Sequence, residues 1–333
     1  MSGFTRSARR VGAAVAAAVL TVGLAACGGG GGTAASGGAT PDGQLEATEL
    51  TIGFTPVADQ AGLIRAINNG YFEAEGLKVT AQPAQGGAAA VPAMVAGDLQ
   101  GVFGTYPSFL LSQQNATKIR IVALGVAGSE DFAGVFVNPN SGITDIKGLV
   151  GKKLAVNTLN NTGELSIKSV LKENGVDPAE VEFMEMPFPD MRAALERGAI
   201  DAAWAVEPFQ SGMNAAGMTK LFSNFSGRTA TAPLAGIGMT EKFVNENPDT
   251  VAAFARAVEK ANAELAQDPE SVRELVPTYT QTNAEVAAKM TLPKWEAGYP
   301  TAEKLKVWND VMVDMGSLTG PVDLDEMVYA PKE

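Results

Sequence analysis

The chain has 333 residues with 25 Lys and Arg, 37 Asp and Glu and no histidine, which gives a net charge of −12. Without histidine, Ser-His-Asp triads and histidine-based zinc sites are excluded, and the acidic balance argues against nucleic acid or anionic lipid as partners. The single cysteine, Cys27, allows neither an internal disulfide nor a Cys-x-x-Cys metal site.

Residues 1–26 are predicted to form an export signal. Three arginines within the first ten residues precede an apolar run over 11–24, and small residues come directly before Cys27. This order is typical of a secretory signal peptide, and the run is shorter than the ~20 residues that span a bilayer comfortably. The pattern Leu-Ala-Ala-Cys resembles a bacterial lipobox, which implies cleavage before Cys27 and lipidation of its thiol. An ordinary signal peptide with a chance cysteine is the alternative.

Residues 27–47 are predicted to be the lipidated cysteine and a flexible linker, because the stretch is rich in Gly, Ala, Ser and Thr and has few large apolar residues. Cleavage of the signal removes three arginines and no acids. The mature chain then carries 22 basic and 37 acidic side chains, a net charge of −15.

Strand and helix patterns alternate after the linker, which predicts an α/β fold with parallel sheets. The first half predicts strands at 50–56, 77–82, 101–107, 119–125 and 134–139, and helices at 61–77 and 86–97. The second half predicts strands at 152–158, 181–187, 202–208 and 220–224, and helices at 163–174 and 189–197. From Glu241 onward the pattern predicts an almost wholly helical tail.

The two halves repeat one plan. A helix ends at Gly97 in the first half and at Gly198 in the second, and a proline follows ten residues later at Pro107 and Pro208. A short apolar strand lies between glycine and proline each time, and proline is favoured in the first turn of a helix. Two lobes of similar plan are therefore expected.

In open α/β sheets, ligands bind beyond the carboxyl ends of the strands, and the N–H groups of helices that start there attract polar or anionic groups. Two lobes that face each other across these loops make a cleft that closes on a small molecule about a hinge near 132–138 and 232–238. The loops are expected at 55–60, 84–88, 105–108, 157–163, 187–190 and 204–208.

Three segments carry a family resemblance: "IGFTPVADQAGLIRAINNGYFEAEGLKV" (52–79), "ITDIKGLVGKKLAV" (143–156) and "AALERGAIDAAWAVEPF" (193–209). Together they resemble bacterial solute-binding proteins of the nitrate/sulfonate/taurine and thiamine-pyrimidine-precursor type, the NMT1/THI5-like family. The resemblance implies a type II periplasmic-binding-protein-like fold, with two α/β lobes joined by two crossover strands. The implied boundaries are 48–134 for lobe 1, 135–232 for lobe 2, and 233–333 for the return to lobe 1 and the C-terminal helices.

The resemblance also implies a function. The chain would be the extracytoplasmic component of an ABC importer, a lipid-anchored monomer that delivers a small solute to a membrane permease with its cytoplasmic ATPase. It would be no enzyme and would hold no cofactor or metal. A surface-anchored, carboxylate-dependent hydrolase and a structural lipoprotein are the alternatives.

The ligand-binding residues are expected in the six loops, and several have a structural alternative. Asp59 could instead cap a helix, Trp204 could instead be core, and polar loop residues could serve turns alone. The loops contain no Lys or Arg, which favours a neutral or nitrogen-containing solute over an anion, although sulfonate binding through helix N-termini stays open. The predicted ligand-binding set is Thr55, Pro56, Asp59, Gln60, Gly86, Gly87, Thr105, Tyr106, Ser108, Asn157, Thr158, Asn160, Thr162, Phe188, Trp204 and Glu207.

Cys27→Ser removes the thiol that lipidation requires. We expect the variant either to be released from the membrane or to keep its signal uncut, as seen by fractionation and intact-mass measurement. An acylated, membrane-bound Cys27→Ser protein would contradict the lipoprotein prediction.

Overall fold

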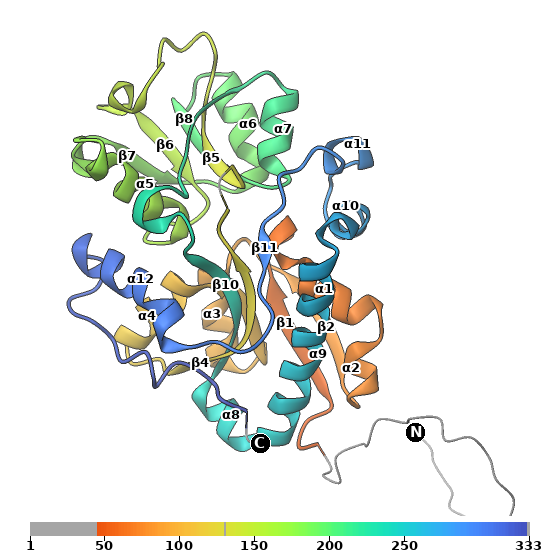
Figure 1. Ribbon diagram of the computed structural model, residues 1–333. Helices are drawn as coiled ribbons and strands as arrows, with labels where there is room; N and C mark the ends of the chain where they lie inside the picture. Colours follow the sequence, from red (N-terminus) through yellow and green to blue (C-terminus); the bar gives the residue numbers. More distant parts are fainter. Residues whose placement is uncertain (1–44, 130, 332–333) are drawn as a thin grey trace, which may run out of the picture. The chain divides into compact units, whose positions relative to one another are not determined.

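Two mixed β-sheets form the framework of the protein in this computed structural model, which describes residues 45–129 and 131–331 (Figure 1). The predicted signal peptide, Cys27 and the linker up to residue 44 lie outside the described residues. The strands of both sheets belong to one compact unit of the chain.

The first sheet has six strands in the order β11-β4-β10-β3-β1-β2. β1 runs parallel to β2 and β3, while β10 runs antiparallel to β3 and β4, and β11 antiparallel to β4. The bounds are β1 Glu49–Phe54, β2 Lys78–Pro83, β3 Gly101–Thr105, β4 Ile119–Ala127, β10 Pro233–Thr240 and β11 Lys294–Trp295.

The second sheet has five strands in the order β7-β6-β8-β5-β9. β6 runs parallel to β7 and β8, and β5 runs antiparallel to β8 and β9. The bounds are β5 Ala133–Val137, β6 Lys153–Val156, β7 Glu182–Glu185, β8 Ala202–Val206 and β9 Thr219–Ser223.

The two sheets exchange one strand each. The chain leaves β4 of the first sheet to form β5 in the second, and it leaves β9 of the second sheet to form β10 in the first. The predicted two-lobed fold with two crossovers is thus confirmed. The predicted parallel arrangement fails at the pairs that involve β5 and β10, because an exchanged strand enters its new sheet in the opposite direction. It also fails at β11, which pairs antiparallel with β4.

The internal repeat is confirmed. Gly97 and Gly198 end their helices or turns with φ of 91° and 69°, a left-handed conformation that favours glycine. β3 and β8 follow them and hold equivalent places in the two sheets, and Pro107 lies in the first turn of α4.

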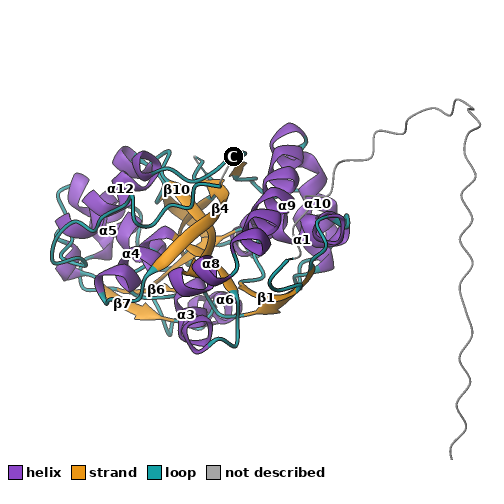
Figure 2. Cartoon of the chain, turned by 90° about the horizontal axis from the view of Figure 1, so that it is seen from below, coloured by secondary structure: helices purple, strands orange, loops and turns teal. Residues whose placement is uncertain are grey.

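Helices cover the sheets, and their amphipathic spacing explains why. α9 buries Val251, Phe254, Val258 and Leu265 at helical spacing, and Phe254 stacks on Phe72 of α2 with ring centroids 5.0 Å apart. Figure 2 shows α9, α1 and α10 to one side of β4 and β10, and α12, α4 and α5 to the other. The α-helices are α1 Ala61–Asn68, α2 Tyr71–Ala74, α3 Gly87–Ala96, α4 Tyr106–Gln114, α5 Thr162–Glu173, α6 Phe188–Glu196, α7 Phe209–Ala215, α8 Glu241–Glu246, α9 Pro248–Gln267, α10 Val272–Leu275, α11 Ala284–Ala287 and α12 Ala302–Asp314.

Short 3-10 helices occur in the connections, at η1 Ala58–Gln60, η2 Ile146–Leu149, η3 Pro178–Glu180, η4 Gly227–Thr229, η5 Pro269–Ser271 and η6 Val276–Thr278. In the part of the chain that the structure describes, no helix has the length and apolar character to cross a membrane.

The prediction of an almost wholly helical tail is wrong between α9 and α12. This stretch holds only short helices and the strand β11, which pairs with the end of β4. Pro277, Pro293 and Pro300 interrupt any longer helix here, because proline lacks the N–H that a helix interior needs. The tail therefore crosses the molecule as an irregular segment that returns to the first sheet.

Candidate ligand-binding site

A small cavity of about 50 Å³ lies where strand ends of the two sheets meet. Its walls come from the β1–α1 loop, the start of α3 and the end of β3 on the first lobe, and from the β6–α5 loop, α6 and β8 on the second. We call it the inner cavity. It is lined by Thr55, Val57, Asp59, Gln60, Gly86, Gly87, Phe103, Gly104, Thr105, Asn157, Asn161, Thr162, Phe188, Trp204, Val206 and Ala235.

Most of the predicted binding residues meet at this cavity. Ten of the sixteen line it, although their contact with a ligand stays a prediction. They are Thr55, Asp59, Gln60, Gly86, Gly87, Thr105, Asn157, Thr162, Phe188 and Trp204.

Two glycines let the start of α3 approach the cavity. A Cβ on Gly87 would lie 2.5 Å from the Gly104 Cα of β3, so only glycine fits there without a backbone shift. A Cβ on Gly86 would lie 3.0 Å from Thr158 Oγ1 and 3.3 Å from Asn157 Nδ2 on the other lobe. No side chain caps this helix, so its first N–H groups remain available to a polar ligand.

A polar network joins the two lobes beside the cavity. Thr105 Oγ1 at the end of β3 donates to Asn161 Oδ1, Asn161 Nδ2 donates to Ser108 Oγ at 2.9 Å, and the two hydroxyls lie 3.0 Å apart. Asn161 also caps α5, since its Oδ1 accepts from the Thr162 N–H at 2.7 Å. Sequence reasoning missed Asn161, although an asparagine directly before a helix start is a strong capping signal.

An aromatic wall closes the second-lobe side. Trp204 of β8 is only 4% exposed, and its Nε1 donates to Asn224 Oδ1 at 3.0 Å. Its ring lies 5.4 Å from the ring of Phe188, and a Cβ on Gly163 of α5 would overlap it. Trp204 is therefore a packed core residue that also lines the cavity, while its contact with a ligand stays a prediction.

Asp59 is the acidic residue of the inner cavity. The side chain is partly buried, and its Oδ1 is closed to solvent and has no hydrogen-bond partner among the described residues. Desolvation raises the pKa of this carboxyl to about 7. It caps neither η1 nor α1, so the helix-capping alternative does not describe it.

Glu207 has the opposite surroundings. This buried carboxylate accepts from Gln210 Nε2 at 3.1 Å, from the N–H and hydroxyl of Ser211 at 3.1 and 3.0 Å, and from the Thr291 N–H at 2.9 Å. Burial raises its pKa, and these hydrogen bonds oppose the rise. Glu207 does not line the inner cavity; it ties the β8–α7 loop to the tail.

The other predicted residues have different places. Pro56 lines an outer chamber described below, while Tyr106 is fully buried as the first residue of α4 rather than the end of a strand. Asn160 is exposed with φ of 52°, and its N–H donates to Glu164 Oε2 at 2.5 Å. Neither Tyr106 nor Asn160 lines the inner cavity.

An outer chamber of about 650 Å³ adjoins the inner cavity, and Thr55 and Phe188 line both. Tyr279 of the tail forms part of its wall and donates from its hydroxyl to the Val57 carbonyl at 3.1 Å. Sequence reasoning missed this wall, because no local signal links residues 278–282 to loops over 200 positions earlier. The lining is Thr55, Pro56, Ala84, Gln85, Pro187, Phe188, Pro189, Pro208, Phe209, Thr278, Tyr279, Thr280, Gln281 and Thr282.

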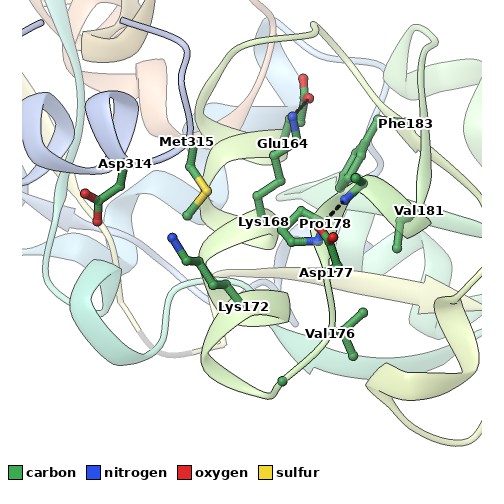
Figure 3. Close-up of a pocket in the computed structure, with 12 residues that line it drawn as sticks. Glu164, Lys168, Lys172, Val176, Asp177, Pro178, Val181, Phe183, Asp314 and Met315 are labelled. Atoms are coloured by element: carbon green, nitrogen blue, oxygen red, sulfur yellow. Dashed lines mark hydrogen bonds and ion pairs between the residues drawn. The ribbon is translucent and has the colours of Figure 1, made fainter.

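A separate groove of about 710 Å³ lies along α5, η3, β7 and the end of α12 (Figure 3). Three of its charged lining residues are already paired: Lys168 with Glu164 at 2.5 Å, and Asp314 with Arg228 at 2.5 Å. None of its lining residues lies in the six predicted loops; Glu164 directly follows the loop at 157–163. The groove is larger than the inner cavity, but the strand ends of the two lobes do not converge on it.

The described residues hold no group of three or more Cys, Asp or Glu placed to bind a metal ion. Two lobes that exchange strands and hold a cavity between their strand ends form the fold of periplasmic solute-binding proteins. Residues 57–272, more than half of the chain, match the family model described as NMT1/THI5 like. The chain belongs to this family, which confirms the resemblance.

Relatives agree with this assignment. The chain is 29% identical over 167 residues to the taurine-binding periplasmic protein of Escherichia coli (strain K12), and the match covers 50% of each protein. The chain thus spans about half the length of this curated relative. The same fold occurs in the periplasmic nitrate-binding protein from Synechocystis PCC 6803, with a TM-score of 0.75 and 18% identity over 86% of this chain and 87% of that one. It also occurs in the periplasmic aliphatic sulphonate binding protein from Escherichia coli, with a TM-score of 0.68 and 16% identity over 85% and 98%.

Trp204→Ala should lower the free energy of unfolding by ~3–5 kcal/mol, because it empties a packed space between Phe188 and α5. Chemical denaturation measures this loss. Phe209→Ala is the matched control. The half-buried ring of Phe209 lines the outer chamber and stacks on Phe188 with ring centroids 5.3 Å apart, so its removal should lower the free energy of unfolding by less. A Trp204→Ala loss below ~1 kcal/mol would contradict the packing described here.

Proposed function

We propose that this chain is the extracytoplasmic solute-binding component of an ABC importer, which holds one small organic solute in the inner cavity and outer chamber. One observation carries the proposal: each lobe contributes to the cavity wall a residue with a buried side-chain oxygen that has no hydrogen-bond partner among the described residues. These atoms are Asp59 Oδ1 on the first lobe and Thr162 Oγ1 on the second. Buried polar atoms are rarely left unpaired, so a ligand between the lobes is the natural partner for both.

The proposal includes the setting of the protein. Cys27 would carry the lipid anchor at the outer face of the bacterial cell membrane, and the body would act as a monomer. Its partners would be a membrane permease and the ATPase of that permease. Family membership supports this setting, and the net charge of −12 gives no support to nucleic-acid binding.

Solute capture would close the lobes about the two crossovers, between β4 and β5 and between β9 and β10. Contacts between the lobes already occur at the cavity, since the Ala58 N–H donates to the Glu207 carbonyl at 3.0 Å and Thr105 donates to Asn161. A ligand that bridges Asp59 and Thr162 would add to these contacts and favour the closed arrangement.

A carboxylate-dependent hydrolase fits less well. Such an enzyme needs two carboxylates around the bond that breaks. Asp59 is the one acid among the described residues that line the inner cavity, and Glu207 is held by hydrogen bonds outside it. Binding without chemical change is the function that this arrangement supports.

Protein purified without denaturation should retain one unchanged small molecule per chain, detected by native mass spectrometry and identified after extraction. Returning the molecule at about 100 times its Kd should stabilise the emptied protein by ~2.7 kcal/mol. Thr162→Val should weaken retention, because it removes a cavity hydroxyl at nearly constant shape. Thr144→Val, on an exposed loop residue, is the matched control. Turnover of the retained molecule, or equal retention by both variants, would contradict the proposal.

A further inference from the structure

The charge of the inner cavity is one-sided. Asp59 lines it, whereas no Lys or Arg does so, and the outer chamber is likewise lined by no charged residue among those described. A ligand in this space meets one carboxyl group and no basic side chain. An anionic group would have to rely on N–H and hydroxyl donors while it faces Asp59.

One oxygen of the Asp59 carboxyl also lacks a partner among the described residues. No ion pair of the described residues involves it, and its Oδ1 is buried without a hydrogen bond. Glu207 in the β8–α7 loop differs, because its carboxylate accepts hydrogen bonds from four donors within the protein. The contrast indicates that Asp59 Oδ1 accepts a hydrogen bond from a ligand, because an unpaired buried acceptor lowers the stability of the protein.

The volumes of the inner cavity and the outer chamber indicate a ligand with a small head and a larger body. About 50 Å³ holds only a small polar head, since one water needs roughly 10–15 Å³ by the same kind of measure. The adjoining 650 Å³ holds a larger body, and Phe188, Phe209 and Tyr279 give it aromatic walls. Aromatic faces favour both flat apolar groups and the positive charge of a nearby cation.

We propose that the solute carries a protonated nitrogen that pairs with Asp59 in the inner cavity, and a ring or other flat apolar group that lies in the outer chamber. This inference rests on the proposed function and names its substrate class, an organic amine. Asp59 is then the residue that determines specificity for the charge of the head group. A sulfonate head at the N-terminus of α3 is the competing assignment.

Three probes with the same ring and spacer separate the two assignments: 2-phenylethylamine, 2-phenylethanol and 2-phenylethanesulfonate. Calorimetric titration of the full mature chain near pH 8 measures each Kd, and tryptophan fluorescence, to which Trp204 of the cavity wall contributes beside Trp295 and Trp308, reports binding. We expect the amine to bind at least about tenfold more tightly than the alcohol. Asp59→Asn should weaken amine binding by at least about tenfold and change alcohol binding by less than about twofold.

Asp190→Asn is the matched control, because Asp190 is an exposed acid in the first turn of α6 that lines neither space. It should leave the amine Kd unchanged, which separates direct pairing from general attraction by an acidic protein. Equal loss in both variants would overturn the inference.

Other outcomes also overturn it. Tighter binding of the sulfonate than of the amine, with a change in tryptophan fluorescence, would reject the amine assignment and leave the proposed function standing. Amine affinity unchanged in Asp59→Asn, or no amine binding at millimolar concentration, would equally reject the assignment. The retention experiment above decides the proposed function independently.

A measurement without ligand tests the unpaired state of Asp59. Its raised pKa means that the folded protein gains stability from this group below the ordinary carboxyl pKa and loses it as the pH rises through about 7. Asp59→Asn removes that loss, so the emptied variant should melt at a higher temperature than the emptied parent near pH 8, with a smaller difference near pH 4. Tyr279 faces Asp59, and its own pKa is raised well above its usual value by burial and by this acid, so it stays neutral throughout. A lower melting temperature for Asp59→Asn near pH 8 would show that the carboxylate has a partner in the protein, and would overturn the inference.

Discussion

The exchange of β5 and β10 between the sheets is the constraint on which the rest of the structure depends. β10 pairs with β3 and β4 of the first lobe, and β5 pairs with β8 and β9 of the second. Each lobe therefore has a central strand that arrives from the other lobe, and neither sheet is complete without the crossover. The same exchange brings the strand ends of one lobe opposite those of the other, and the inner cavity lies there.

The acidic groups at this junction illustrate two ways to bury a carboxyl group. Glu207 lies inside a set of donors that includes the Thr291 N–H from the tail, so its charge stabilises the contact between lobe and tail. Asp59 lies a few residues from the end of β1 without such a set of donors, and desolvation raises its pKa against the smaller effect of a hydrogen bond from its own backbone. The fold thus supplies four donors to Glu207 and leaves one oxygen of Asp59 without a partner among the described residues.

Local signals in the sequence predicted a large part of this arrangement. The glycine and proline spacing at Gly97, Pro107, Gly198 and Pro208 aligned β3 with β8, because turn and helix-start chemistry depends on a few neighbouring residues. The rule that ligands bind beyond the carboxyl ends of strands then predicted ten of the residues that line the inner cavity. Tyr106 was misplaced because α4 begins one residue after β3 ends, a boundary that periodicity does not resolve.

The parts that were missed depend on distant contacts. Tyr279 reaches Val57 across more than 200 positions, and β11 pairs with β4 from a stretch whose prolines give no strand signal. The antiparallel direction of β5 and β10 follows from the crossover, and alternating strand and helix patterns carry no information about it. The crossover was predicted from the family resemblance alone. The outer chamber could not be predicted, because tertiary contacts of residues 278–282 form its wall.

A crystal structure of the mature protein with the solute it retains on purification would test the central claim most directly. The account predicts density for one small molecule between the lobes, in contact with Asp59 and Thr162 and extending past Phe188 toward Tyr279. A retained molecule located in the groove along α5, or an inner cavity that holds only water while the protein is saturated, would contradict it.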